Sequence, residues 1–476
     1  MSIRRQESGV REQGGIRLKG PAGLLYHVFV LGLAAVSVQA QAPSDSAVRA
    51  ILTRRAESWK GPGIVVGWSE AGKRRFVSYG NRVAGGPALD ERTVFEIGSI
   101  TKVFTGTLLG DMVARGEVKL DDPIAKYLPG GAKSPERGGK VITLLDLATQ
   151  SSGLPRMPTN FAPKDTENPY ADYGADRMYA FLSGYTLTRD IGAQYEYSNF
   201  GMGLLGDLLA RRLKLTYEQA ITQRVLTPLG LAETRITLTP ELNARFATGH
   251  SGAFAPTKAW DLDALAGAGA IRSTTEDLLR YAEASLAPEK TRLARAITTA
   301  TEPLRATTIP GTRIGLAWHV RDVNGHSIVW HNGGTGGFHS FVAFDRGTGR
   351  AVAVLTNTTQ TIDDIGFHLI DSTLPLQEPR PVVVHAEIKL DPGSLDRFVG
   401  EYQLAPGFSI VVTKENDALW AQATGQSRFQ IFPEAPERFF FKVVDAQISF
   451  TMDGTGKVTG LTLHQGGRDT PGPKIR

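Results

Sequence analysis

The spacing of hydrophobic residues predicts a sheet whose strands come from both ends of one long segment. Between these ends, residues 142–304 have mainly helical periodicity, broken by loops rich in Pro, Asn and Gly. We therefore expect an α/β fold with an antiparallel sheet, flanking helices and a helical insert. The expected elements are a helix at 44–60, strands at 63–69, 74–79, 314–322, 327–331, 340–345 and 351–356, and a closing helix at 363–369.

The pattern changes again near the C-terminus. Residues 375–392 are rich in proline and valine and read as a linker. Short alternating runs separated by turn residues then predict a small antiparallel sheet or barrel over 393–476. Its expected strands are 408–413, 418–423, 428–431, 438–443, 446–452 and 458–463. The first domain accordingly spans 41–374.

Residues 1–40 have the pattern of a secretory signal. Five Lys or Arg residues precede an apolar run at 24–38, which ends at Val38-Gln-Ala40. The alternative is an uncleaved membrane anchor, which the short run and His27 make less favoured. We expect a secreted or periplasmic protein with no membrane contact beyond this segment, and the absence of cysteine suits export without disulfides.

The charge balance argues against a nucleic-acid partner. The net charge is +5, but residues 1–40 hold five Lys or Arg and two Glu, or +3, which leaves +2 for the rest. No basic run stands out in the remainder. Composition alone therefore indicates an ordinary globular protein.

The first candidate for chemistry is Ser99-Ile-Thr-Lys102, at the head of an apolar stretch. Residues three apart on a helix share a face, so a hydroxyl nucleophile and an amine base can meet there. The apolar side chains that follow cover more than one face, which predicts a buried helix. Burial would lower the lysine pKa from its ordinary value of about 10.4. Such a short pattern is common by chance, so it needs support from elsewhere in the chain.

Two distant stretches supply that support. Residues 195–199, Tyr-Glu-Tyr-Ser-Asn, precede an apolar helix, so Tyr197 and Asn199 can point from a loop into a cleft. Residues 330–337, Trp-His-Asn-Gly-Gly-Thr-Gly-Gly, end a predicted strand, and the glycines allow a substrate to approach the backbone closely. A phosphate-binding loop is disfavoured because no Lys-Ser/Thr follows these glycines.

These three motifs, in this order, resemble those of class C β-lactamases and related penicillin-recognising serine hydrolases. They begin at Ser99, Tyr197 and His331, which lie 98 and 134 residues apart. The flank 95–102 and the phrase 142–155, Ile-Thr-Leu-Leu-Asp-Leu-Ala-Thr-Gln-Ser-Ser-Gly-Leu-Pro, are also similar to that family, with Gln150 where histidine is frequent. The likeness covers about 50–370, and it implies the β-lactamase/transpeptidase-like fold. The C-terminal segment is similar to the lipocalin-like domain attached to some members.

The resemblance implies a small-molecule substrate and a role for each motif residue. Ser99 would be acylated, Lys102 or Tyr197 would take its proton, and no metal or cofactor would be needed. The backbone N–H groups of Ser99 and Gly334 would form an oxyanion hole. The residues expected to bind substrate are Asn199, His331, Asn332 and Gly333.

The third motif departs from the β-lactamase pattern. His331 stands where lysine is usual, and Asn332 replaces a hydroxyl residue, so a fixed positive charge is missing near neutral pH. We expect β-lactam hydrolysis first. A D-amino-acid peptidase or D-Ala-D-Ala carboxypeptidase, a carboxylesterase, and a penicillin-binding sensor without turnover are the alternatives, and the oligomeric state is open. His250, His319, His326, His339 and His368 lie outside the motifs and are expected to be packing or surface residues.

Overall fold

The computed structural model describes residues 43–59, 61–379, 385–424, 428–442, 446–465 and 468–476. The predicted signal segment at 1–40 lies outside this range. Within the described part of the chain, no helix combines the length and the apolar character that crossing a bilayer requires.

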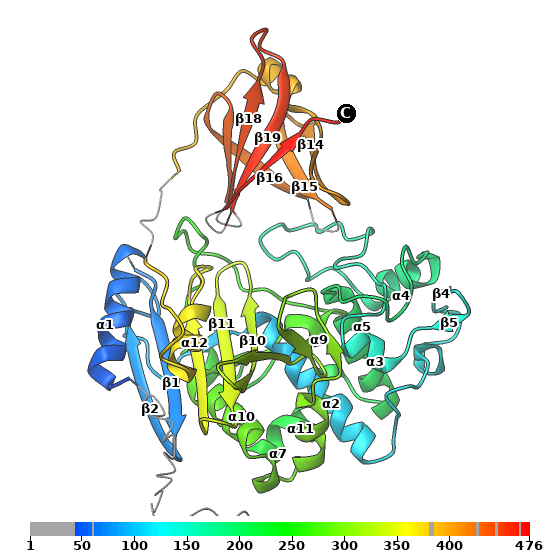
Figure 1. Cartoon of the computed structure of the whole chain (residues 1–476), viewed down its shortest axis with the longest axis vertical. Helices are drawn as coiled ribbons and strands as arrows, with labels where there is room; N and C mark the ends of the chain where they lie inside the picture. Colours follow the sequence, from blue (N-terminus) through cyan, green and yellow to red (C-terminus); the bar gives the residue numbers. More distant parts are fainter. Residues whose placement is uncertain (1–42, 60, 380–384, 425–427, 443–445, 466–467) are drawn as a thin grey trace, which may run out of the picture. The chain divides into compact units, whose positions relative to one another are not determined.

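An eight-stranded sheet of antiparallel neighbours forms the centre of the first domain (Figure 1). Strand β1 pairs with β12 from Ile64↔Thr356 to Glu70↔Arg350, so the two ends of the domain meet in mid-sheet. In order across the sheet, the strands are β2 (Lys73–Tyr79), β1 (Ile64–Glu70), β12 (Arg350–Thr356), β11 (His339–Asp345), β10 (His326–Gly334), β9 (His319–Val323), β8 (Thr312–Ile314) and β7 (Arg305–Ala306). This topology confirms the predicted antiparallel sheet built from both ends.

The predicted strand at 314–322 is wrong in one respect, because it is two strands. Strand β8 ends at Ile314 and β9 begins at His319. The connecting turn contains Ala317 in the left-handed region, at φ 69°. That conformation is unusual for a residue with a Cβ atom. The hydrophobic pattern gives no sign of it, so the break between the two strands was not predicted.

The two faces of the sheet are covered by different helices (Figure 1). Alternate residues of β1 point to opposite faces: Ile64 and Val66 pack with α1 (Asp45–Ala56) and α12 (Asp363–Ile370), whereas Val65 belongs to the core that contains α2 and α10. The helices that cover this second side are α2 (Thr101–Ala114), α10 (Thr275–Leu286) and α11 (Ala294–Thr301).

Helix α2 is the central element of the larger core. Its residues from Thr101 to Met112 are all buried, as the all-round apolar pattern predicted. Two glycines let neighbours approach: a Cβ atom at Gly106 would lie 2.1 Å from the Leu316 carbonyl oxygen, and one at Gly110 would lie 2.4 Å from that of Ala296. This packing fixes the helix that carries Lys102.

The helical insert packs against α2 and brings the second motif to it. A short ladder between β3 (Val94–Glu96) and β6 (Arg272–Thr274), which the sequence pattern did not reveal, ties its end to the strand before Ser99. The other strands and α-helices between α2 and α10 are β4 (Glu136–Arg137), β5 (Lys140–Val141), α3 (Leu144–Ala148), α4 (Ala175–Gly184), α5 (Asn199–Leu213), α6 (Tyr217–Ile221), α7 (Thr227–Leu229), α8 (Pro240–Asn243) and α9 (Ala266–Gly269).

The C-terminal segment is a nearly closed barrel of eight antiparallel strands. Its two ends meet, since the Ile475 amide donates to the Glu401 carbonyl over 2.7 Å. The barrel prediction is confirmed, but two of its strands, the first and the last, were not expected. The strands are β13 (Gly400–Ala405), β14 (Phe408–Glu415), β15 (Ala418–Ala423), β16 (Arg428–Ala435), β17 (Arg438–Phe441), β18 (Ala446–Met452), β19 (Val458–Gln465) and β20 (Arg468–Pro473).

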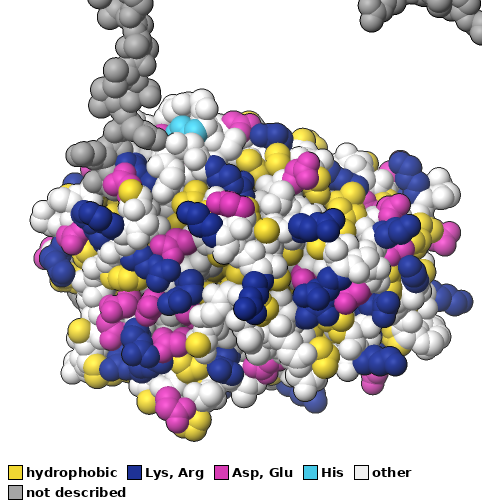
Figure 2. Space-filling model, turned by 90° about the horizontal axis from the view of Figure 1, so that it is seen from below, with side chains coloured by type: hydrophobic (Ala, Val, Ile, Leu, Met, Phe, Trp, Pro, Cys, Tyr) yellow, Lys and Arg dark blue, Asp and Glu magenta, His cyan; other side chains and the backbone are white. Residues whose placement is uncertain are grey.

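Charged side chains of both signs are interspersed on the face drawn in Figure 2. Lys and Arg lie beside Asp and Glu there, with hydrophobic and uncharged atoms between them. Mixed charge of this kind is typical of a solvated surface. The absence of a nucleic-acid partner stays a prediction.

Candidate active site

Ser99 and Lys102 lie at the junction of a short turn and a long helix. Ser99 is in a 3₁₀ turn, Gly98–Ile100, directly before α2 begins at Thr101. The Lys102 Nζ donates to the Ser99 Oγ over 3.0 Å and to the Ala268 carbonyl of α9 over 2.6 Å. Ser99 keeps partial exposure while Lys102 is fully buried, so solvent reaches the nucleophile but not the amine.

The surroundings of Lys102 favour its neutral form. Burial holds the pKa of Lys102 well below its ordinary value, and the positive charge of Arg156 lowers it further. A neutral amine carries a lone pair, and the hydroxyl of Ser99 is within its hydrogen-bonding reach. The pair therefore has the geometry of a nucleophile and its base.

Tyr197 completes the group from the loop before α5. Lys102 Nζ lies 4.8 Å from the centroid of the Tyr197 ring, and the Arg156 Cζ lies 5.0 Å from the same centroid. Burial raises the pKa of Tyr197 to about 12, although a hydrogen bond with Ser99 and the charge of Arg156 both act to lower it. The phenol is thus protonated at neutral pH and can donate a hydrogen bond beside the Ser99 hydroxyl.

Gln150 holds the loop that carries Tyr197. Its side-chain oxygen accepts from the Ser198 amide over 2.7 Å, and its backbone oxygen accepts from the Glu196 amide over 2.7 Å. Gln150 is buried with φ 57°. Ser198 in turn caps α5, since its hydroxyl accepts from the Gly201 amide over 2.8 Å. Gln150 therefore positions the second motif on both sides of Tyr197.

The glycines of the third motif bring β10 against the nucleophile. A Cβ atom at Gly333 would lie 2.1 Å from the Ile97 carbonyl oxygen and 2.9 Å from the Ser99 nitrogen. Gly98, at φ 47°, likewise leaves no room for a Cβ atom, which would lie 2.8 Å from the Gly334 nitrogen. The Ser340 hydroxyl ties the two segments by donating to the Ile97 carbonyl over 2.8 Å. The N–H groups of Ser99 and Gly334 therefore come from adjoining backbones.

His331 lies beside Tyr197, but without a charge. Its ring centroid is 6.4 Å from that of Tyr197 and 5.1 Å from that of His319. Burial holds the pKa of His331 well below its ordinary value, and His319 and Lys102 add to this effect. Its Nδ1 bonds to the Asn332 carbonyl. The position that holds a charged lysine in β-lactamases therefore holds a neutral ring here.

A family comparison agrees with this geometry. The family model described as Beta-lactamase matches residues 48–373, which is more than half of the chain. This protein belongs to the β-lactamase family.

Several curated relatives share this region. A Beta-lactamase of Pseudomonas fluorescens is 30% identical over 330 residues, covering 62% of this chain and 88% of the relative. The D-alanyl-D-alanine-carboxypeptidase/endopeptidase AmpH of Escherichia coli is 29% identical, covering 67% of this chain and 85% of the relative. Penicillin-binding protein 4* of Bacillus subtilis is 26% identical and covers 80% of this chain and 87% of its own. Relatives with different names thus match comparably well.

A solved structure shows the same fold. A class C beta-lactamase superposes with a TM-score of 0.60 at 21% identity, covering 71% of this chain and all of the other. The barrel region, 385–472, matches a model described as a domain of unknown function. The lipocalin-like resemblance of the barrel is therefore not confirmed.

Two predicted substrate-binding amides have different surroundings in this β-lactamase-family site. The Asn199 Nδ2 contacts the Met157 sulfur at 3.8 Å, beside Tyr197. The Asn332 amide instead donates to Asp363 of α12 over 2.5 Å, and His339 bonds the other oxygen of that carboxylate at 2.8 Å. The Asn332 side chain is thus engaged by a carboxylate within the fold, whereas the Asn199 side chain contacts a thioether.

Glu96 is a buried carboxyl that the motif analysis did not single out. Its Oε1 accepts from the Trp260 amide over 2.6 Å, and the Arg272 Nη2 lies 3.9 Å from it. Burial raises the pKa of Glu96 to about 7, while a hydrogen bond with Thr335 opposes the rise. The carboxyl therefore links the strand before Ser99 to the residue that follows Gly334.

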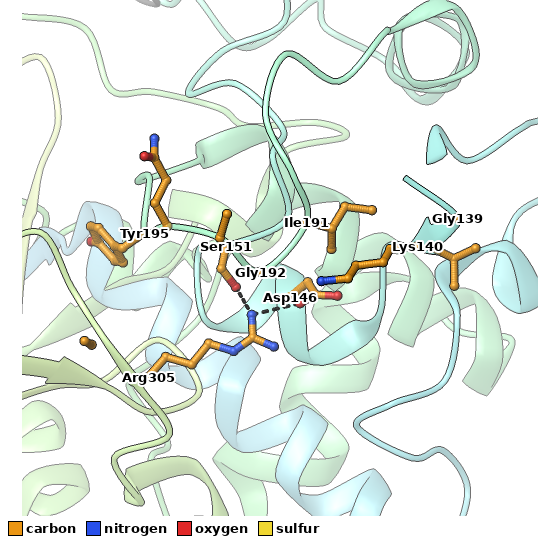
Figure 3. Close-up of a pocket in the computed structure, with 12 residues that line it drawn as sticks. Gly139, Lys140, Asp146, Ser151, Ile191, Gly192, Tyr195 and Arg305 are labelled. Carbon is orange, nitrogen blue, oxygen red and sulfur yellow. Dashed lines mark hydrogen bonds and ion pairs between the residues drawn. The ribbon is translucent and has the colours of Figure 1, made fainter. Parts of the chain in front are cut away.

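A cavity of about 730 Å³ opens beside the second motif (Figure 3). Tyr195 lines it and also bonds His319 Nε2 over 3.1 Å, so one wall contacts the histidine pair. On another wall, Arg305 bonds Ser151 and pairs with Asp146, as the dashed lines show. The lining residues do not include Ser99, Lys102 or Tyr197.

Sequence reasoning missed two residues near the reactive group. His319 was expected to be a packing or surface residue; it is buried, and its ring lies against His331. Arg156 follows the family-like phrase by one residue and was not considered. The hydrophobic pattern carries no signal for the contacts of these two residues, because each contact joins segments that are distant in the sequence.

Proposed function

We propose that this protein is an exported serine hydrolase that acts through an acyl-enzyme on Ser99. The observation that carries the proposal is the 3.0 Å contact between Lys102 Nζ and the partly exposed Ser99 Oγ, next to the Tyr197 ring. A hydroxyl, a neutral amine and a phenol together supply a nucleophile and two proton-carrying groups. Export rests on residues 1–40, which lie outside the described residues.

In the acylation step, Ser99 Oγ attacks the substrate carbonyl carbon and its proton passes to Lys102. Lys102 is favoured as the resting base because its pKa is lowered, whereas the pKa of Tyr197, about 12, keeps that phenol protonated at neutral pH. The tetrahedral oxyanion would accept hydrogen bonds from the Ser99 and Gly334 amides. The bond to the leaving group then breaks, and the proton reaches that group through Tyr197.

Deacylation repeats the sequence with water as the nucleophile. Water attacks the ester carbon of acylated Ser99, and Lys102 or Tyr197 takes its proton. The Ser99–acyl bond breaks, and Ser99 recovers a proton as the free acid leaves. The cycle needs no electron transfer and no group beyond the protein and water.

β-Lactam hydrolysis is the activity we propose first, because relatives named Beta-lactamase match most of the first domain. A second candidate is hydrolysis of D-amino-acid peptides or simple esters. The neutral His331 favours this second candidate, since a fixed cation at that position would help to hold a β-lactam carboxylate. The relative named D-alanyl-D-alanine-carboxypeptidase/endopeptidase AmpH supports it as well.

A substrate panel with the intact protein separates these candidates. We would measure kcat/KM for a chromogenic cephalosporin, a D-alanyl-D-alanine peptide and a p-nitrophenyl ester, with Ser99→Ala as the control. We expect turnover of at least one substrate and a loss of about 10³-fold or more in Ser99→Ala. Equal rates in both proteins would refute the proposal. A stable penicillin adduct without turnover of any substrate would instead indicate a sensor.

A further inference from the structure

We propose that Arg156 binds a carboxylate of the substrate at the edge of the Ser99 site. This inference rests on the proposed function, and it names the residue that recognises the anionic group of an ester or amide substrate. Arg156 suits this role because of its position, because its backbone is held, and because its charge has no carboxylate partner among the described residues.

Arg156 approaches the same aromatic ring as the proposed base. Its Cζ lies 5.0 Å from the Tyr197 centroid, where Lys102 Nζ lies at 4.8 Å. The guanidinium is exposed, whereas Lys102 is buried, so the two groups approach the phenol from regions of different solvent access. A guanidinium over a ring face is restrained there by its attraction to the ring.

The backbone of Arg156 is attached to the second motif. Its carbonyl oxygen accepts hydrogen bonds from two backbone N–H groups, that of Asn199 over 3.0 Å and that of Phe200 over 3.2 Å. The next residue, Met157, contacts the Asn199 side chain. The backbone of Arg156 is therefore attached to the start of α5, where the asparagine of the motif lies.

The charge of Arg156 has no carboxylate partner among the residues that the structure describes. Neighbouring arginines differ in this respect: Arg189 pairs with Glu196, and Arg305 pairs with Asp146 at 2.8 Å. The positive charge of Arg156 also acts on the site, since it lowers the pKa of both Lys102 and Tyr197. An anion bound at Arg156 would gain a charge-assisted hydrogen bond without displacing an internal acid.

Arg156 also supplies the fixed positive charge that the third motif lacks. Since His331 is buried and neutral, it offers no fixed charge to an anionic substrate. A guanidinium matches the planar geometry of a carboxylate and can bind it in a bidentate manner. The carboxylate could belong to the acyl part or to the leaving group, and both sources share this chemistry.

Two matched substrate pairs distinguish the sources. On the acyl side, mono-p-nitrophenyl glutarate is compared with p-nitrophenyl valerate. On the leaving-group side, 3-carboxyphenyl butyrate is compared with its carboxamide. Each is assayed with the wild type, Arg156→Gln and Arg156→Lys, and with Arg212→Gln as a control that removes an exposed charge from the far end of α5.

We expect Arg156→Gln to lower kcat/KM about tenfold for the acid of at least one pair and less than twofold for its neutral partner. Arg156→Lys should recover part of the loss, and Arg212→Gln should change neither. Added salt should reduce the preference for the acid in the wild type and in Arg212→Gln, but not in Arg156→Gln. An equal loss on acid and neutral substrates, or no loss on either acid, would overturn the inference. If Ser99→Ala hydrolyses all four esters as well as the wild type, the proposed function itself fails.

Discussion

Lys102 Nζ donates to the Ala268 carbonyl at 2.6 Å and to the Ser99 hydroxyl at 3.0 Å. The first contact anchors the amine to α9, and the second directs it at the nucleophile. Because the amine is buried, its neutral form is favoured, and the same two contacts then leave it ready to accept a proton.

Replacement of Lys102 should remove most of the activity without unfolding the protein. Lys102→Met keeps a long side chain in the buried site but removes the base, so kcat should fall about 10²- to 10⁴-fold. In the wild type, kcat/KM should rise with pH as the amine loses its proton, at a pH well below the ordinary lysine pKa. Stopped-flow acylation rates between pH 5 and 10 measure both effects. A rate that is independent of Lys102 would contradict the assignment.

His331 should not titrate in the range where a free histidine does. Since burial keeps its pKa well below about 6.5, the ring stays neutral from pH 6 to 8. The ratio of kcat/KM for a cephalosporin to that for a neutral ester should therefore be flat over this range. A ratio that falls as pH rises through 6.5 would show instead that a protonated His331 holds the substrate carboxylate.

Gly333→Ala should damage catalysis through the backbone. The new Cβ atom would lie 2.1 Å from the Ile97 carbonyl oxygen, so β10 and the Ser99 turn would have to separate. A displacement of about 1 Å can cost about 10²-fold in kcat/KM. Gly130→Ala is the matched control, because its Cβ atom would meet nothing within 4 Å. Similar kinetics for both variants would show that the close approach is unimportant.

Glu96 should make the stability depend on pH in an identifiable way. Its pKa is raised to about 7 in the folded state. Its contribution to the free energy of unfolding is therefore greatest below about pH 4.5 and is lost as the pH rises through 7. Glu96→Gln does not titrate, and the unfolding free energy of the wild type should fall relative to it by about 3 kcal/mol over that interval. Urea unfolding at pH 4.5, 6 and 7.5 measures the difference, which would be constant if Glu96 were ionised throughout.

The motifs of the site could be read from the sequence because their order and spacing are specific. Ser99, Lys102, Tyr197 and His331 come together as the family resemblance implied. The charge state of His331 could not be read, since burial by distant segments sets it. The engagement of Asn332 by Asp363 was hidden for the same reason.

Some elements of the fold could likewise be predicted from the sequence, and others could not. Long periodic segments such as α2 and the buried strands β1 and β12 were predicted, because one strong pattern fixes each of them. The barrel strand β20, Arg-Asp-Thr-Pro-Gly-Pro, reads as a loop by composition, yet it pairs with β19 from Gly460↔Pro473 to Gln465↔Arg468. Its strand conformation depends on barrel closure, which no local pattern records.

The most direct test of the account is the mass of the protein after brief reaction with a β-lactam or an activated ester. The account predicts a transient covalent adduct on the peptide that contains Ser99, which decays as product forms and is absent in Ser99→Ala. An adduct on another residue, or hydrolysis by Ser99→Ala at the wild-type rate, would contradict it.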